Sequence, residues 1–547
     1  MKIKHFILVL AFSFCWHLLL QGQTVAEARH LIWYSRPASA ILAMEKIIQH
    51  DPANAEALFF YTIACAQSNN IKSLQLARNL VLPDVKQVPY GQCALGEICL
   101  FERKNDSATF FFNEAMQKTK QKNADILFAV ALANIETQGG DLLLATSLLQ
   151  KAIQKDKVHA SLYYVAMGNA YMKLHDGNEA YKAYSLASKY DPRNPEAPFR
   201  LGTIFASQDN SNACLKYFNQ SIAADSLYSP AWHALYTHYY FSNPAQAMIC
   251  FKHYVACSDP NPSNDYLLTD LLYLNKKYAE AVDRAKVLIS QEDSSGNPRL
   301  YKLIAYCYKE LKDTAAALHF MRQYFNLAKD SSLVLQDFET MAEMYAAYPS
   351  KYDSAAFYYS KVAELEKDAS KNLEGYKKII DLYKQAKEYD KEAYWLGVYY
   401  NANKNASNLD LFNWGVAEYF AGNYRSAADI FSRYIEKYPD QAFGYCWKAR
   451  SNAAIDTSME SGIAVPDYVK VIEVAEKDSA NTFNKKALIE SYGYIAAYKA
   501  NIQKDYPGAI EEFERLIQVD PNNSNARRYL ALLKRNMTEG QASNGGH

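Results

Sequence analysis

The sequence predicts an all-α solenoid built from antiparallel helix pairs. Three observations carry this prediction: apolar residues recur with a period of 34, their spacing fits one face of each of two helices, and Asp-Pro pairs recur where the second helix should end. The composition agrees, because 44 Tyr and only 20 Gly among 547 residues suit large rings packed between helices.

The period is clearest in the stretch that starts at Ser161. Positions 4, 7, 8, 11, 20, 24, 27 and 32 of that stretch are Tyr164, Met167, Gly168, Tyr171, Ala180, Tyr184, Ala187 and Pro192. Later stretches repeat the pattern with Gly202, Phe218, Gly415, Ala427, Phe431, Ala509 and Phe513. Positions 4 to 11 form one face of a first helix, and positions 20 to 27 one face of a second. Small residues at positions 8 and 20 let the two backbones approach, and large residues fill the space around them.

Helix ends can also be read from the sequence. Asp-Pro pairs occur at Asp51, Asp191, Asp259 and Asp520. The residue before proline is pushed out of the α region, so we expect second helices to end there. Asn and Asp between the helices are expected to cap helix N-termini.

These motifs resemble the tetratricopeptide-repeat (TPR) family over nearly the whole chain after residue 23. The units start near Gln21, Ala55, Pro89, Asn123, Ser161, Pro195, Ser229, Pro262, Pro298, Leu335, Leu373 and Asn408, with looser units from Ala442 and Lys486. The resemblance implies a TPR solenoid in which antiparallel helix pairs form a right-handed superhelix, with first helices lining a concave groove.

The regularity of the repeat varies along the chain. We expect irregular TPR-like repeats over residues 24–160, a regular array over 161–441, and TPR-like repeats over 442–537 with an insertion near 453–469. Residues 538–547 are polar and are expected to be a disordered tail.

Residues 1–23 have the pattern of a signal peptide. Lys2 and Lys4 precede an apolar run from Phe6 to Trp16, and polar residues follow at Gln21 to Gln23. The run is short for a membrane anchor. Lipidation of Cys15 stays open, although Phe14 is large for the position before a lipidated cysteine. We therefore expect an exported bacterial TPR protein, in the periplasm or at the outer-membrane periphery of a Gram-negative bacterium.

Charge and composition restrict the partners. The 59 basic and 59 acidic residues balance, which gives no electrostatic support for nucleic-acid binding. No later segment has the apolar run of a transmembrane helix, so we expect no such segment after signal removal, while peripheral membrane association stays possible. The eight cysteines after Cys15 have no Cys-x-x-Cys spacing and are expected to be buried and free.

The resemblance also implies a binding groove, because TPR ligands usually meet first-helix positions 2, 5, 9, 12 and 13. An aromatic strip occupies these positions in the units from Pro195 to Pro262: Phe199, His233, Thr237, Tyr240, Phe241, Tyr266, Asp270 and Tyr273. A mixed-charge strip follows, and it includes Arg299, Lys302, Lys309, Glu310, Lys377 and Lys384. Such strips suit an extended peptide or a partner helix, and they equally suit sugar rings. A third interpretation is that the superhelix coils tightly and the rings pack on neighbouring repeats.

No catalytic or metal-binding motif is found. The sequence lacks a nucleophile elbow, a Gly-rich phosphate loop and a His-Glu-x-x-His motif, and its histidines are scattered. We expect no catalytic residues, no metal and no cofactor. The function predicted is a non-enzymatic scaffold of the cell envelope that binds a protein or peptide partner in the groove. The alternative is a glycan-binding protein of the envelope that uses the aromatic strip.

Overall fold

The computed structural model describes residues 24–291 and 297–544. The expected signal peptide of residues 1–23 lies outside the described residues. The chain divides into two compact units, residues 1–292 and 293–547, here called the N-terminal and C-terminal units. All regular elements of the described residues are helical. The division falls inside residues 161–441, the stretch that the sequence predicted as one regular array. Repeat spacing alone does not determine how many repeats pack into one compact body.

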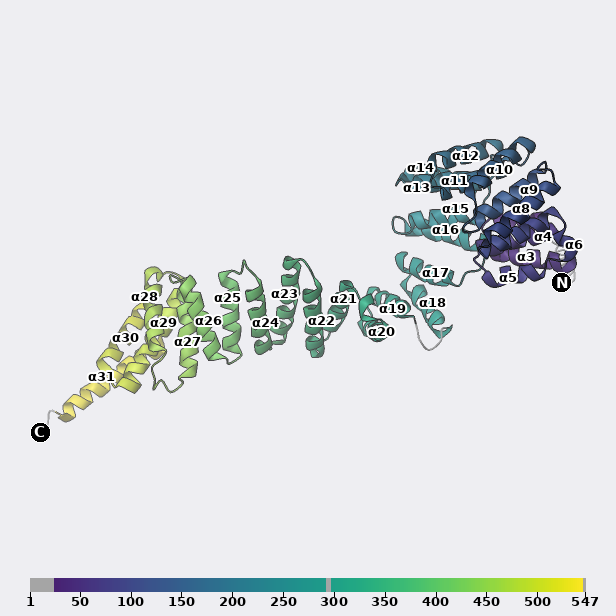
Figure 1. Cartoon of the computed structure of the whole chain (residues 1–547). Coiled ribbons are helices and arrows are strands. Elements are labelled where there is room, and N and C mark those ends of the chain that lie inside the picture. The colour runs from purple at the N-terminus through teal and green to yellow at the C-terminus, as the bar shows by residue number, and fades with distance from the viewer. Residues whose placement is uncertain (1–23, 292–296, 545–547) are drawn as a thin grey trace, which may run out of the picture. The chain divides into compact units, whose positions relative to one another are not determined.

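The N-terminal unit consists of successive helix pairs (Figure 1). Its helices are α2 (Val25–Trp33), α3 (Pro37–His50), α4 (Ala55–Gln67), α5 (Ile71–Asn79), α6 (Pro83–Lys86), α7 (Pro89–Phe101), α8 (Asn105–Lys118), α9 (Ala124–Glu136), α10 (Leu142–Lys155), α11 (Ala160–Lys173), α12 (Gly177–Tyr190), α13 (Glu196–Ala206), α14 (Ser211–Ala224), α15 (Ser229–Tyr239), α16 (Pro244–Cys257), α17 (Ser263–Leu274) and α18 (Tyr278–Gln291). The short α6 lies where the repeat pattern is lost before Pro89, and it packs on α7.

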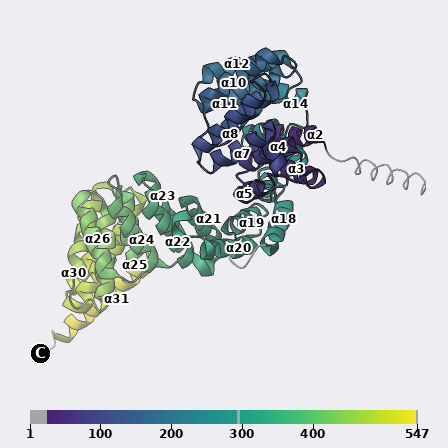
Figure 2. The ribbon, with the colours of Figure 1, turned by 45° about the vertical axis from the view of Figure 1, so that its right-hand side comes forward.

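The C-terminal unit continues the same pairing, and Figures 1 and 2 show its pairs following one another in chain order. Its α-helices are α19 (Pro298–Glu310), α20 (Thr314–Leu327), α21 (Leu335–Ala346), α22 (Tyr352–Leu365), α23 (Ala369–Ala386), α24 (Tyr389–Ala402), α25 (Asn408–Phe420), α26 (Tyr424–Lys437), α27 (Ala442–Ile455), α28 (Val465–Ala475), α29 (Thr482–Tyr498), α30 (Tyr506–Val519) and α31 (Ser524–Asn544).

Two irregular stretches of the sequence have different outcomes. The insertion expected near 453–469 forms turns over residues 456–464, between α27 and α28. The disordered tail expected from Thr538 is helical over residues 538–544, where α31 continues. The polar composition suggested disorder, but no proline interrupts this segment and its single glycine costs a helix only about 1 kcal/mol.

Polar residues cap many helices, as predicted. Asn70, Asp176 and Asp313 each accept a hydrogen bond from a backbone N–H in the first turn of the helix that follows. Asp51, Asp191 and Asp520 directly follow the last residues of α3, α12 and α30. Asp259 is the exception, because α16 already ends at Cys257.

The two helices of a pair meet where a glycine of the first helix faces an aromatic ring of the second. A Cβ atom added at Gly168 would lie 2.3 Å from the Tyr184 ring, and one at Gly202 would lie 2.5 Å from the Phe218 ring. The same contact joins Gly415 to Phe431 in the C-terminal unit, at 2.7 Å. Glycine is needed at these positions because the rings occupy the space of a side chain.

The remaining residues that the sequence assigned to helix packing are also in the interior. Ala180, Ala427, Ala509 and Phe513 are buried, and Tyr171 is half-buried against the core of the N-terminal unit. All eight cysteines from Cys65 to Cys446 are buried and free. They fill small apolar spaces between helices.

The first helices α4, α7 and α9 are buried on every side. In each of them ten consecutive or nearly consecutive residues are inaccessible to water. The reason is that α7 packs against both α4 and α9, in addition to its own partner α8. A helix that is apolar all round must be covered all round, so these first helices form a core where the sequence predicted a groove.

Candidate partner-binding site

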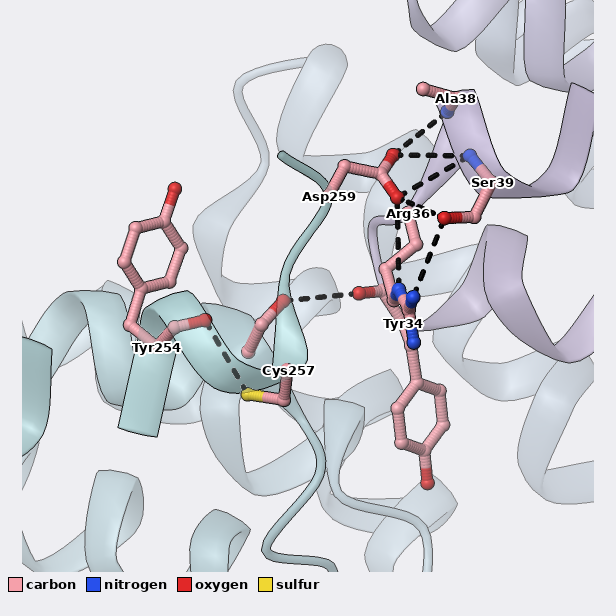
Figure 3. A network of polar contacts seen from close by, with 8 residues as sticks. Tyr34, Arg36, Ala38, Ser39, Tyr254, Cys257 and Asp259 are labelled. Carbon is pink, nitrogen blue, oxygen red and sulfur yellow. Dashed lines mark hydrogen bonds and ion pairs between the residues drawn. The ribbon is translucent and has the colours of Figure 1, made fainter. Parts of the chain in front are cut away.

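The N-terminal helix pair is attached to the α16–α17 loop, about 220 residues further along the chain (Figure 3). The Asp259 carboxylate accepts hydrogen bonds from the backbone N–H groups of Ala38, at 2.8 Å, and Ser39, at 3.3 Å. It also accepts from the Ser39 hydroxyl and lies 3.6 Å from Arg36 Nε. These N–H groups belong to the first turn of α3, which has no side-chain cap from its own N-cap residue. Asp259 therefore caps α3 from a distant repeat.

A second set of contacts supports this attachment. Tyr34, at the end of α2, donates a hydrogen bond from its hydroxyl to Asp225. Its backbone carbonyl accepts from the Ser229 hydroxyl at 3.2 Å, and its ring packs edge-on against Tyr228. Burial, the hydrogen bond and the negative charge of Asp225 all raise the pKa of Tyr34. The helix pair α2–α3 thus lies on α15, which belongs to the seventh pair of the unit.

These contacts border a cavity of about 1080 Å³. Three residues of the predicted aromatic strip line it: Phe199 from α13 and His233 and Thr237 from α15. Ser35 before α3, Pro37 at the start of α3 and Asp259 also line it. The volume exceeds what one amino-acid side chain fills and is in the range of small-ligand and short-peptide sites.

His233 is the titratable group in the middle of this wall. Its ring lies edge-on to Tyr254, with 5.0 Å between ring centroids, and to Tyr236, at 5.7 Å. Burial among these rings lowers the pKa of His233. The imidazole is therefore neutral at neutral pH, and the cavity offers it as a hydrogen-bonding group without charge.

The rest of the aromatic strip does not line this cavity. Tyr240 contacts Phe241 edge-on, with 4.7 Å between centroids, and Phe241 is 83% exposed. Tyr266, Asp270 and Tyr273 belong to α17 and are half-buried. The strip is thus split between a cavity wall and a separate aromatic surface.

The mixed-charge strip lies in the C-terminal unit. Lys302 contacts the buried Asp337 at 2.6 Å, and Lys309 contacts Glu343 at 2.7 Å. Each of these pairs joins α19 to the next first helix, α21. Lys377 lies 5.4 Å above the ring of Tyr399.

The other three charged residues of that strip are accessible to water. Arg299 and Glu310 are exposed at the two ends of α19, and Lys384 is exposed near the end of α23. The division between the two units separates all of these residues from Phe199 and His233. The aromatic strip and the mixed-charge strip therefore belong to different units.

Sequence reasoning missed the contacts that attach α2–α3 beside the cavity. Tyr34, Arg36 and Ser39 are ordinary residues of an irregular first repeat, and Asp259 was interpreted only as a helix terminator. No local pattern connects them to one another. A usable signal was present in the apolar runs of α4 and α9, which leave no polar face for a groove.

Two negative findings apply to the residues that the structure describes. Within them, no helix has both the length and the apolar character needed to cross a bilayer. In the same residues, no three His, Cys, Asp or Glu side chains are grouped closely enough to hold a metal ion.

Comparison with known proteins identifies one repeat by sequence. The tetratricopeptide repeat family matches residues 411–440, which span most of α25 and all of α26. No curated protein matches the chain.

Several solved structures are similar to parts of the chain. The C-terminal part of a TPR repeat-containing protein from Cytophaga hutchinsonii is 25% identical over 48% of this chain and 98% of its own, with a TM-score of 0.29. A tetratricopeptide repeat protein from Parabacteroides merdae is 15% identical over 47% and 98%, with a TM-score of 0.29. YrrB, described as a TPR protein with an unusual peptide-binding site, is 16% identical over 35% and 97%, with a TM-score of 0.23.

These TM-scores are too low to support an argument about function. The fold follows from the helix pairs, their recurring glycine–aromatic contacts and the family match at residues 411–440. The chain carries a tetratricopeptide repeat, and its fold is an all-α TPR solenoid.

Proposed function

We propose that this chain is a non-enzymatic scaffold that binds a protein or peptide partner in the cavity beside α13 and α15. The observation that carries the proposal is the cavity of about 1080 Å³, whose wall is apolar and polar, with Asp259 bound to α3. Phe199 and Phe218 offer apolar surface, while Thr203, Thr237 and neutral His233 offer hydrogen bonds. This combination suits a peptide segment with apolar side chains and unpaired backbone groups.

The proposal includes export to the cell envelope. It is supported by the charged, apolar and polar order of residues 1–23. Cell fractionation should place the chain in the periplasm or with the outer-membrane periphery, shortened by about 23 residues at its N-terminus. A full-length chain in the cytoplasm would contradict this part of the proposal.

The test of partner binding is cross-linking in intact cells followed by mass spectrometry. Thr237→Arg places a long cation in the cavity, and Leu143→Arg on α10 adds the same cation at a residue that is already 69% exposed. We expect a partner whose cross-links map near Phe199 and His233, and we expect Thr237→Arg to abolish its capture while Leu143→Arg does not. A partner captured equally by both variants would contradict the assignment of the cavity.

A glycan-binding function is the second candidate, and the exposed ring of Phe241 beside Tyr240 favours it. Sugar rings stack on such faces. A glycan panel monitored by intrinsic fluorescence should then show quenching that Phe241→Ala removes and Thr237→Arg leaves unchanged. Unchanged fluorescence across the panel would reject this candidate.

A further inference from the structure

A second, smaller cavity lies inside the N-terminal unit. It has a volume of about 380 Å³, and its walls come from α2, α4, α9, α11 and α13. Trp33, Phe128 and Leu132 form apolar parts of the wall. Glu136, Asn169, Glu196 and Arg200 form a polar part. Both the size and this mixture of apolar and convergent polar groups are typical of small-molecule sites.

The hydrogen bonds of Glu196 and Arg200 are unevenly distributed. Glu196 Oε1 accepts from Arg200 Nε at 3.1 Å, from Arg200 Nη2 at 2.9 Å and from Asn169 Nδ2 at 3.4 Å. Within the described part of the chain, no hydrogen bond reaches Glu196 Oε2 or Arg200 Nη1. Both residues line the cavity, and the Arg200 side chain keeps 37% of its accessible surface. The pair therefore offers the cavity one acceptor and one donor.

The orientation of this pair is fixed by its surroundings. Asn169, which donates to Glu196, also accepts from the Tyr184 hydroxyl at 2.7 Å. Burial opposes the charge of Arg200, but Glu196, Tyr228 and Tyr184 together outweigh it and raise the pKa of the guanidinium. Arg200 is thus a permanent cation in a preorganised position, so little side-chain entropy is lost when it binds a ligand.

The charges that line the cavity are unbalanced. Glu136 and Glu196 are two carboxyl groups, and Arg200 is one cation. Burial and the charge of Glu196 raise the pKa of Glu136, while Lys173, Arg200 and a hydrogen bond from Gln67 oppose that rise. Lys173 donates its hydrogen bond to the carbonyl of Ile135 and is not part of the cavity wall. A ligand with an ammonium group would add a positive charge beside these two carboxyl groups on the cavity side.

We infer that this cavity binds a small zwitterion, an amino acid or a dipeptide with a free ammonium and a free carboxylate. The ammonium would lie between Glu136 and Glu196 Oε2, and the carboxylate would accept from Arg200 Nη1. The apolar side chain of such a ligand would face Trp33 and Phe128. The inference does not depend on the proposed partner site, because the larger cavity shares with this one only Ser35 and Pro37.

The test is isothermal titration calorimetry on the full chain with each common L-amino acid and with Gly-Gly. We expect binding by at least one of them, weakened tenfold or more when the same compound is N-acetylated or amidated. Glu136→Gln keeps the shape of the side chain and should weaken binding tenfold or more. His233→Ala, in the larger cavity, is the matched control and should leave the affinity unchanged.

Arg200→Lys keeps the charge but loses the planar donor group, and it should weaken binding of the carboxylate. If that variant does not fold, Glu136→Gln and the blocked ligands still decide the question. The inference is overturned if the folded chain binds none of the compounds at 10 mM, a concentration that nearly saturates a site with a dissociation constant of about 1 mM. Equal binding of the N-acetylated forms, or full binding by Glu136→Gln, would also overturn it.

Discussion

The same helix-pair repeat is used in two ways, and the contrast is greatest between the start of the N-terminal unit and the C-terminal unit, since α15 and α17 at the end of the N-terminal unit bury only four residues each. In the N-terminal unit the first helices α4, α7 and α9 each bury ten residues. In the C-terminal unit α19 buries four and α25 buries three. The repeat itself therefore fixes only the contact within a pair, and the remaining face of the first helix decides whether a core or an open surface forms.

The chemistry between successive first helices differs accordingly. In the N-terminal unit, apolar and small residues of α4, α7 and α9 touch directly. In the C-terminal unit, Lys302 and Lys309 of α19 bind carboxylates of α21. Apolar contacts exclude water from the axis, whereas ion pairs tolerate water beside them. Cavities shielded from water are therefore expected in the N-terminal unit, where first helices meet through apolar contacts.

The largest expected effect tests how dry the N-terminal core is. Glu97 on α7 is 0% exposed, and burial raises its pKa to about 8, although the hydrogen bond from Thr62 opposes the rise. A pKa raised in the folded state means stability that is complete below the unfolded value and is lost as pH rises through 8. We expect unfolding free energy to fall by on the order of 4 kcal/mol between pH 5 and 9. Urea unfolding at several pH values measures this loss.

The contact geometry agrees with a protonated Glu97. Thr62 Oγ1 lies 2.5 Å from Glu97 Oε2 and 2.7 Å from the carbonyl oxygen of Phe59. One hydroxyl hydrogen cannot serve both contacts, so a proton on Glu97 satisfies the second. Glu97→Gln should therefore remove most of the pH dependence. Glu343→Gln is the matched control, since Glu343 holds the same repeat position in the C-terminal unit but is 40% exposed. If the unfolding free energy of Glu97→Gln still falls with pH as in the unchanged chain, the Glu97 carboxyl is not the source of the pH dependence.

The next effect concerns the ion pairs of the C-terminal unit. Asp337 is fully buried, and besides Lys302 it accepts from the Tyr324 hydroxyl at 2.9 Å. Lys302→Met leaves a buried carboxylate without its cation and should cost about 3 kcal/mol in thermal or urea unfolding. Lys309→Met removes an exposed pair and should cost less than about 1 kcal/mol. Equal costs would mean that both pairs are solvated alike, which would weaken the distinction between buried and open contacts. Adding Asp337→Asn to Lys302→Met should restore part of the loss.

A smaller effect is expected at the attachment of α2–α3. Asp259→Ala removes the distant cap of α3 and the contact with Arg36, and should cost about 2 kcal/mol. Asp313→Ala removes a single local cap, that of α20, and should cost about 1 kcal/mol. Hydrogen exchange should rise across α2 and α3 in the Asp259 variant alone. Unchanged exchange in these helices would mean that the apolar contact of Tyr34 with Tyr228 suffices for the attachment.

The periodic part of the structure could be predicted because it is local. The pairs start at or near the predicted residues, for example at Pro89, Ser229, Pro298 and Asn408. Within a pair, Gly168 and Tyr184 are 16 residues apart and belong to one motif, so spacing alone identifies their contact.

The enclosing contacts could not be predicted in the same way. Whether Asp259 reaches Ala38 depends on small rotations between repeats, summed over seven pairs, and no residue spacing records that sum. For the candidate site, repeat position selected first-helix residues for a groove, and three of them, Phe199, His233 and Thr237, line the larger cavity. Repeat position did not show that Lys302 forms an ion pair with Asp337, because this contact depends on side chains of the next repeat. The sequence did not predict the small cavity, because Glu136 and Arg200 come from different repeats.

The smallest expected effect tests what the two units share. Gly202→Ala and Gly415→Ala push a methyl group against Phe218 and Phe431, and such overpacking costs about 1–3 kcal/mol. Alanine stabilises a helix by about 1 kcal/mol relative to glycine, which offsets part of this cost. The free energy of unfolding of both variants should therefore fall by about 1 kcal/mol. Gly493→Ala is the control, since its Cβ would lie 3.5 Å from Leu516, an ordinary contact, and it should gain stability. Thermal unfolding of the three variants measures the signs. A larger loss of stability for Gly202→Ala than for Gly415→Ala would mean that aromatic rings of the N-terminal unit move less easily than those of the C-terminal unit. Equal losses of stability would mean that the two units differ only in the outer face of their first helices.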